Sequence, residues 1–346
     1  VPVAGARRGA CREFPEPCQE MRLPDPSEPL GDPEAVFARI LSGRVEDSEI
    51  AQFLSGLAHR GETVAEIVGA ACALRAQMIA VDAPADAIDV CGTGGDGQHT
   101  RNISTAVAIV SAAAGATVAK HGNRAASSRS GAADVLSCLD LDLDLPPARV
   151  EASIREIGIG FLFAARHHPV MARVAPVRRA LKRRTIFNVL GPLSNPAGVK
   201  RQLVGVFAPD WVPPLAAALR DLGTQRAMVV HGLDGLDELT VTADTIACEV
   251  GGPHEGEYRI APEKAGLKRH ELAAIQGGTP EENAAALVRL LDGEAGGYRD
   301  IVVLNTAAAL MIAGRAADLR EGAALAEKTI DSGDASRKLT EWRKFR

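Results

Sequence analysis

The chain has 346 residues, of which 46% are apolar and 24% are charged, and its net charge is −5. This is the profile of a globular protein with ample length for a large core and two domains. Without a long basic block, it is a poor candidate for binding nucleic acid or an anionic membrane surface. Its six cysteines are scattered without a C-x-x-C pair, which argues against a disulfide framework or zinc site and favours a cytoplasmic location.

The first part of the chain predicts an extension followed by a small helical domain. Residues 1–32 are rich in proline and charge and lack the apolar segment of a signal peptide, so we expect them to be poorly ordered. Residues 33–85 carry apolar side chains at helical spacing, and Gly43 and Gly61 separate the helical pieces. Asp47 and Thr63 stand where helices begin.

Residues 86–346 show short apolar runs between helical stretches, which predicts an α/β domain with a mostly parallel central sheet. We expect strands within residues 88–90, 117–119, 202–207, 227–230 and 301–304. The longest apolar stretch, residues 103–119, is broken by Gly115 and predicts a buried helix followed by a strand, not a membrane span. Residues 244–260 favour antiparallel strands or loops, and residues 316–332 and 335–344 favour amphipathic helices.

A second helix-rich stretch, about residues 146–192, interrupts this alternation. It carries a cluster of basic side chains: Arg166, His167, His168, Arg173, Arg178 and Arg179. Its composition resembles that of the N-terminal helices, so we expect it to join them in one helical domain. A hinge cleft between the helical and α/β parts is then the natural place for a ligand.

The first motif that carries chemistry is a glycine loop after the expected strand at 88–90. Four glycines fall within residues 92–97, and a helix opening on Ser104 and Thr105 follows. Exposed backbone amides and a helix N-terminus suit a phosphate or pyrophosphate. The carboxylate of Asp96 implies a ribose hydroxyl or a metal ion nearby. The spacing matches neither a P-loop nor a dinucleotide fingerprint, and a glycine turn that merely closes a βα unit is the alternative.

Two further motifs are expected at the same sheet edge. The stretch from Lys120 to Gly131 starts where the next strand ends and combines a lysine with serines and glycines that can meet a phosphate. Asp237 and Glu238 follow the strand at 227–230, and adjacent carboxylates there suit Mg²⁺. Taken singly, the lysine is more often a solvated surface residue and the acidic pair a helix start or loop charge.

The fourth motif, residues 183–196, leaves two readings open. Residues 188–196 are either part of a site or a rigid connector without chemistry. Arg178, just upstream, is a better functional candidate because arginine binds a carboxylate through two parallel hydrogen bonds. His121, His167 and His168 are either ring-stacking partners or structural histidines. No Ser/His/Asp or Cys/His nucleophile arrangement stands out.

The four motifs, GTGGDG with NIST, KHGNR with SS, RTIFN with LGPL and NP, and HGLDGLDE, resemble in this order those of the anthranilate phosphoribosyltransferase family. The resemblance covers residues 35–345. It implies a small helical domain joined to a larger α/β domain, a homodimer, Mg²⁺ dependence and an active site at the hinge. Donor positions carried over from the family are Gly92, Gly95, Asp96, Thr100, Asn102, Ile103, Ser104, Thr105, Lys120, His121, Gly122, Asn123, Arg124, Ala125, Ala126, Ser127, Ser128 and Ala132.

The same resemblance places Mg²⁺ on Ser104, Asp237 and Glu238. It places anthranilate near Gly92, Asn123 and Arg178, with His121 and His168 as added candidates. Lys120, Asp96 and Arg178 are the residues expected to act on the reacting groups. Two departures stand out. Ala132 replaces a frequent serine, for which Ser128 or Ser130 is a candidate substitute, and residues 138–142 lack the usual leucine–glycine ending.

The implied reaction is Mg²⁺-dependent transfer of phosphoribosyl from its pyrophosphate donor to the amine of anthranilate, in tryptophan biosynthesis. A pyrimidine nucleoside phosphorylase is the enzyme alternative, but it needs no metal–pyrophosphate site, so the acidic pair argues against it. A non-catalytic relative that binds nucleic acid should show degraded motifs and strong positive charge, and the chain has neither. A related transferase that uses another aromatic acid stays open.

Overall fold

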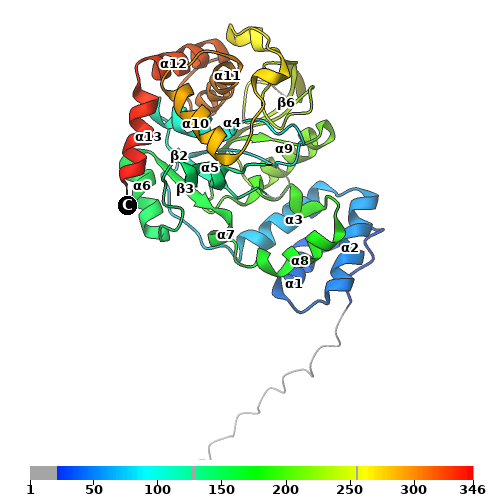
Figure 1. Ribbon diagram of the computed structural model, residues 1–346. Coiled ribbons are helices and arrows are strands. Elements are labelled where there is room, and N and C mark those ends of the chain that lie inside the picture. Colours follow the sequence, from blue (N-terminus) through cyan, green and yellow to red (C-terminus); the bar gives the residue numbers. More distant parts are fainter. Residues whose placement is uncertain (1–21, 126–128, 255, 346) are drawn as a thin grey trace, which may run out of the picture.

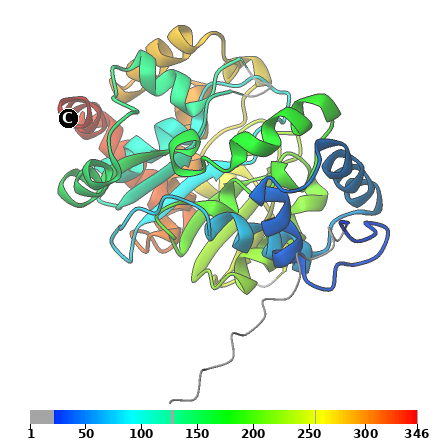
Figure 2. The same ribbon diagram turned by 90° about the horizontal axis from the view of Figure 1, so that it is seen from below.

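A computed structural model of the chain describes residues 22–125, 129–254 and 256–345. A small group of helices lies beside a larger α/β domain (Figure 1). The view from below places the N-terminal helices and the C-terminus on opposite sides of the molecule (Figure 2). Within the described residues, no helix combines the length and apolar character needed to cross a bilayer.

The small domain is built from α1 (Pro33–Ser42), α2 (Asp47–Arg60), α3 (Val64–Arg75) and α8 (Met171–Leu181). Its local signals are those of the sequence: Thr63 and Glu66 form a capping box at the start of α3, and Gly43 ends α1 with φ of 75°. The apolar faces meet around Phe37, Leu54 and Val174, which are buried.

The packed chain begins earlier than residue 33. Leu30 is buried and its amide donates to Glu66, and the amide of Leu23 donates to Glu49. The expectation of a poorly ordered extension is therefore wrong for residues 22–32. These contacts are made by single residues, so they leave no hydrophobic periodicity in the sequence of this segment. The remainder of that expectation, residues 1–21, lies outside the described residues.

The large domain holds one seven-stranded sheet in the order β3-β2-β1-β4-β5-β6-β7. Its strands are β1 (Ile88–Gly92), β2 (Val118–Gly122), β3 (Ile159–Phe163), β4 (Arg201–Gly205), β5 (Arg226–Gly232), β6 (Thr245–Val250) and β7 (Glu257–Ile260). The first five are parallel and the last two pair antiparallel. The connection from β1 to β2 runs toward one edge of the sheet, and the connection from β4 to β5 runs toward the other. The strand order therefore reverses between β1 and β4. Ligands of open α/β sheets bind outside the carboxyl ends of the strands at such a point.

Helices cover both faces of the sheet. Leu203 and Val204, neighbours in β4, point to opposite faces and are buried in two separate cores. The larger core lies under α4 (Ile103–Ala113), α5 (Ala132–Cys138), α10 (Pro280–Leu291), α11 (Gly297–Ile312), α12 (Leu319–Asp331) and α13 (Asp334–Lys344). On the other face α9 (Val212–Asp221) packs between the sheet and α3, which joins the helical domain to the core.

Two predictions of secondary structure are wrong. Residues 301–304 lie inside α11, where all residues from Ile301 to Ile312 are buried. A continuous apolar run looks the same for a buried strand and for a helix buried all round. The second error is β3, which lies in the stretch predicted to be helical. There β3 is part of the sheet and is contacted by α6 (Pro147–Ile157) and α7 (Ala164–His167), whereas α8 packs on the N-terminal helices. The other predicted strands and the two C-terminal helices are present.

Candidate active site

A crevice of about 640 Å³ opens at the carboxyl ends of β1 and β2 and is closed on its other side by α8. Of the predicted site residues that the structure describes, all except Thr105 line it. Thr105 is buried in α4, and Ala126, Ser127 and Ser128 lie outside the described residues. A second hollow, of about 800 Å³ among α10, α12 and α13, contains none of the motif residues.

The glycine loop after β1 needs glycine for two reasons, which are positive φ at three positions and a close approach at Gly92. Gly94, Gly95 and Gly97 have positive φ, between 66° and 77°. The amide of Gly94 donates to Asp237 over 2.7 Å. A Cβ at Gly92 would overlap the Asp237 carboxylate and lie 3.0 Å from its Cγ, so only glycine admits that side chain. The loop is therefore shaped around the acidic motif that follows β5.

Three carboxylates meet where the glycine loop and the β5 loop face each other. Burial and the neighbouring carboxylate of Asp96 raise the pKa of Asp237. Burial and Asp237 raise the pKa of Glu238 well above its ordinary value, and Glu238 accepts from the Ser104 backbone amide. Negative charge is concentrated in this cluster, with Lys120 as a neighbouring cation, and carboxylate oxygens are ligands that suit a hard divalent cation. Within the described residues, no three acidic, histidine or cysteine side chains are placed to hold a metal ion by themselves.

Lys120 supplies positive charge beneath this cluster. Its side chain is only 1% exposed, and its Nζ donates to the carbonyl of Val90 at 2.7 Å and to Ser104 Oγ at 3.2 Å. An ammonium has three N–H donors. Lys120 therefore has one N–H donor left for the phosphate contact that the sequence predicts. Its other two donors are used within the protein, one of them to orient the Ser104 hydroxyl.

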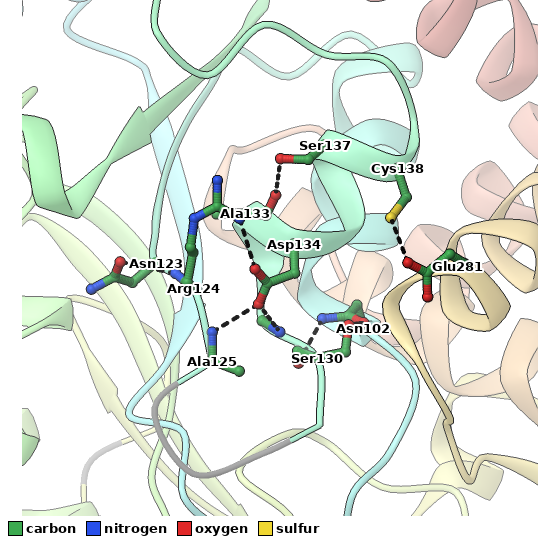
Figure 3. A network of polar contacts seen from close by, with 11 residues as sticks. Asn102, Asn123, Arg124, Ala125, Ser130, Ala133, Asp134, Ser137, Cys138 and Glu281 are labelled. Carbon is green, nitrogen blue, oxygen red and sulfur yellow. Dashed lines mark hydrogen bonds and ion pairs between the residues drawn. The ribbon is translucent and has the colours of Figure 1, made fainter.

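Other residues that the sequence assigns to the phosphoribosyl donor also line the crevice. Ile103 belongs to the core, although it reaches the crevice. Thr100 pairs with Gln276 in an isolated bridge. The side chain of Asn102 holds Ser130, because its Oδ1 accepts from Ser130 Oγ at 3.0 Å and its Nδ2 donates to the Ser130 carbonyl (Figure 3). The Ser130 hydroxyl is thus engaged within the protein, and Ala132 leaves no hydroxyl at its own position.

The opposite end of the crevice carries an arginine and two neutral imidazoles. Arg178 on α8 lies over the Phe187 ring, 5.8 Å from its centroid, and has no carboxylate partner among the described residues. Burial lowers the pKa of His121 to about 3 and that of His168 to about 4. Their rings meet edge to face, with centroids 5.2 Å apart. This end offers a cation and flat rings, as an aromatic acid requires.

The hydrogen bonds of the ring nitrogens show which of the three histidines is structural and which could contact a ligand. His167 Nδ1 lies 2.7 Å from the Ile79 carbonyl, and its side chain does not line the crevice. His121 Nδ1 bonds the Gly191 carbonyl, and its buried Nε2 has no partner among the described residues. Neither nitrogen of buried His168 makes a hydrogen bond of normal geometry with the described residues, although the Ser194 backbone lies close enough to act on its pKa.

Sequence reasoning missed three groups that hold this site. Arg184 donates to the Gly95 carbonyl and stacks 3.8 Å above the centroid of Phe207, tying residues after α8 to the glycine loop. Gly205 ends β4 where a side chain would overlap the Asp237 backbone. A glycine at the end of a buried strand was the available signal for that close approach.

The third group explains the stretch 188–196. Asn195 Nδ2 donates to buried Asp89 and to the Ala119 carbonyl, both at 2.8 Å. Asp89 in turn accepts from the backbone amide of His121 at 3.0 Å. The stretch is therefore more than a connector, since it ties β1 to β2, the two strands whose carboxyl ends open into the crevice. Turns Ile186–Asn188 and Pro192–Ser194 bring it there.

Comparison with known proteins first defines a class. Residues 32–78 match the model of the helical bundle domain of a glycosyl transferase family, and residues 84–336 match the a/b domain of the same family. A curated anthranilate phosphoribosyltransferase from Parvibaculum lavamentivorans is 58% identical over 305 residues, which are 88% of this chain and 89% of that one. A relative of the same name from Novosphingobium aromaticivorans is 53% identical, over 92% of this chain and 98% of its own.

Solved structures agree. The crystal structure of anthranilate phosphoribosyltransferase from Thermus thermophilus has a TM-score of 0.88 and 46% identity, covering 92% of this chain and 96% of its own. The Saccharomyces cerevisiae enzyme in complex with PRPP and Mg has a TM-score of 0.84 and 29% identity, covering 92% of each chain. The chain belongs to the anthranilate phosphoribosyltransferase family. Its reaction is the transfer of a phosphoribosyl group from 5-phosphoribosyl 1-pyrophosphate to anthranilate in tryptophan biosynthesis.

Proposed function

We propose that the crevice between α8 and the sheet binds both substrates of this transfer, each on its own wall. The donor lies along the glycine loop and the residues from Lys120 to Ala132, and anthranilate lies against Arg178, His168 and Phe187. One observation carries the proposal: a single crevice has a crowded acidic cluster at one end and an arginine without a carboxylate partner among the described residues at the other.

Mg²⁺ fits the acidic end. Ser104, Asp237 and Glu238 would hold it, with Asp96 beside them or on the ribose hydroxyls. The support is the raised pKa of the buried carboxylates together with an oxygen-only donor set. When bound, the ion supplies positive charge to the pyrophosphate as negative charge develops there. The structure of the yeast relative contains Mg with PRPP.

The chemistry asks the protein to stabilise a leaving anion and to orient a nucleophile. The bond between ribose C1 and the pyrophosphate oxygen breaks with its electron pair on the oxygen, and the bond from the anthranilate nitrogen to C1 forms. Lys120, the loop amides and the N-terminus of α4 stabilise the leaving group. Arg178 holds the anthranilate carboxylate and so aims the amine at C1. The amine is neutral at pH 7 and already nucleophilic, and it loses a proton after the bond has formed.

The test removes the acidic pair. Asp237→Asn with Glu238→Gln should abolish most turnover, followed as loss of anthranilate fluorescence, and should remove the dependence on Mg²⁺ concentration. Asp142→Asn with Asp144→Asn is the matched control, because it removes two exposed acids outside the crevice. Wild-type turnover and an unchanged Mg²⁺ response in the first variant would contradict the proposal.

Three broader features belong to the same proposal. The helical domain comprises residues 33–85 together with α8, and the rest of the chain from residue 86 forms the α/β domain. The resemblance to the family favours a homodimer, which sedimentation of the protein would test. Cys72, Cys91, Cys138 and Cys248 are free thiols, in agreement with a cytoplasmic location.

A further inference from the structure

Asp134, the third residue of α5, binds two segments of the chain that lie against each other in the crevice wall. Its Oδ2 accepts from the backbone amides of Ala125 at 2.9 Å and of Gly131 at 3.0 Å (Figure 3). Its Oδ1 accepts from Arg124 Nη1 at 2.9 Å. One carboxylate thus joins an arm that leaves β2, residues 123–125, to an arm that enters α5, residues 129–132.

The two arms touch because their residues permit it. A Cβ at Gly131 would lie 2.6 Å from the carbonyl carbon of Arg124 and 2.8 Å from the carbonyl oxygen of Asn123, inside any normal contact. The same carbonyl of Asn123 accepts from the Ala133 amide at 3.2 Å. Gly131 and Asp134 together therefore set the distance between the arms.

The position of the second arm is fixed from its other side as well. Asn102, the residue before α4, holds Ser130 through both polar atoms of its side-chain amide, and Asn283 of α10 donates to the same Asn102 Oδ1 at 3.0 Å. Asn123, Arg124, Ala125, Ser130, Gly131 and Ala132 all line the crevice. A shift of one arm would therefore move the wall that faces the donor.

The charge of Asp134 is compatible with a neighbouring phosphate. Burial acts to raise the pKa of this carboxyl, but the amides of Ala125 and Gly131 and the Arg124 guanidinium hold the pKa below its ordinary value. The group is ionised at neutral pH, and the guanidinium of Arg124 compensates its charge. The guanidinium itself lies over the Phe163 ring, with its central carbon 5.7 Å from the ring centroid.

We infer that Asp134 is a positioning residue for the phosphoribosyl pyrophosphate site, which it serves by holding the two arms of the crevice wall at a fixed separation. It acts through Ala125, Gly131 and Arg124 and touches no substrate. The inference rests on the proposed placement of the donor along this wall. A carboxylate that merely caps α5 would stabilise the fold and leave donor affinity unchanged.

The decisive variant is Asp134→Asn, which keeps the shape but turns an N–H₂ group toward a backbone N–H. We expect the donor Kd from calorimetry and the donor KM to rise tenfold or more, while the KM for anthranilate changes less than twofold. Asp134→Glu, which restores the carboxylate, should recover part of the donor affinity. Gly131→Ala leaves the carboxylate in place and forces the arms apart, so it should show the same donor-selective defect even if Asp134→Asn folds poorly.

Glu321→Gln is the matched control. Glu321 is also the third residue of its helix, α12, and its carboxylate accepts from the Ala317 amide at 2.7 Å, away from the crevice. Loss of thermal stability in both variants with unchanged donor Kd in Asp134→Asn and Gly131→Ala would overturn the inference, and so would an equal rise of both KM values. If the wild-type protein itself fails to bind the donor, the proposed function is wrong, and this inference falls with it.

Discussion

Gly92→Ala isolates the fit between the glycine loop and the acidic motif. The added methyl would overlap the Asp237 carboxylate, lie 3.0 Å from Asp237 Cγ and lie 3.3 Å from the Asp237 carbonyl oxygen. Asp237 cannot withdraw through the backbone, because its carbonyl already lies against Gly205. The side chain must rotate away and give up the hydrogen bond from the Gly94 amide, which measures 2.7 Å.

The magnitude follows from that displacement. Non-bonded carbon atoms settle at about 3.5–4.0 Å, so the carboxylate must move by roughly 0.5–1 Å. A misplacement of this size in a reacting constellation costs about 100-fold in rate. Overpacking at one position costs about 1–3 kcal/mol of stability, so the variant should still fold.

Turnover measured by anthranilate fluorescence, with thermal unfolding alongside, checks this prediction. Gly31→Ala is the control, because its Cβ would meet no atom within 4 Å and its φ is not positive. If Gly92→Ala keeps the kcat and donor KM of the wild type, the close approach of Asp237 to β1 has no part in the reaction. A collapse of stability beyond the expected range would mean that the loop serves the fold first.

Two further predictions concern the acceptor end. Arg178→Ala should weaken anthranilate binding by about 1.5–3 kcal/mol, roughly ten- to 150-fold in KM, for the loss of a charged hydrogen bond, while donor Kd stays within twofold. Equal losses for both substrates would show that Arg178 binds phosphate or supports the fold. The lowered pKa values of His121 and His168, about 3 and about 4, mean that the unfolded chain binds protons first as pH falls below about 6.5. Each histidine should therefore contribute a loss of about 2 kcal/mol of stability between pH 7 and pH 5 in urea unfolding. The raised pKa values of Asp237 and Glu238 act in the opposite direction over this range, so the test is the difference between the wild type and His168→Gln, which should change by about 2 kcal/mol.

Much of the site was predictable because its parts obey local rules. The glycine loop, the segment from Lys120 and the acidic pair each follow an apolar strand, and the carboxyl ends of parallel strands lie at one edge of a sheet. The start of α3 was likewise readable from Thr63 and Glu66, whose capping box involves neighbours along the chain.

The remainder depends on contacts between residues remote in sequence or on patterns with two meanings. Asn195 and Asp89 are 106 residues apart, and nothing local to either indicates the other. Residues 301–304 give an apolar run that suits a strand and a buried helix equally, and their surroundings in α11 decide the outcome. Lys120 is basic by sequence, but its near-complete burial is a property of the packed sheet.

The two walls of the crevice come from different domains, so the residues for the donor and those for the acceptor can change independently in evolution. In the proposed arrangement the α/β wall binds the phosphorylated sugar and the acceptor lies against α8, whose Met171, Ala172, Ala175 and Arg178 line the crevice. Substitutions on one helix can therefore change which nucleophile is accepted without disturbing how the sugar is activated. A library restricted to these α8 positions is the natural starting point for engineering transfer to other aromatic amines.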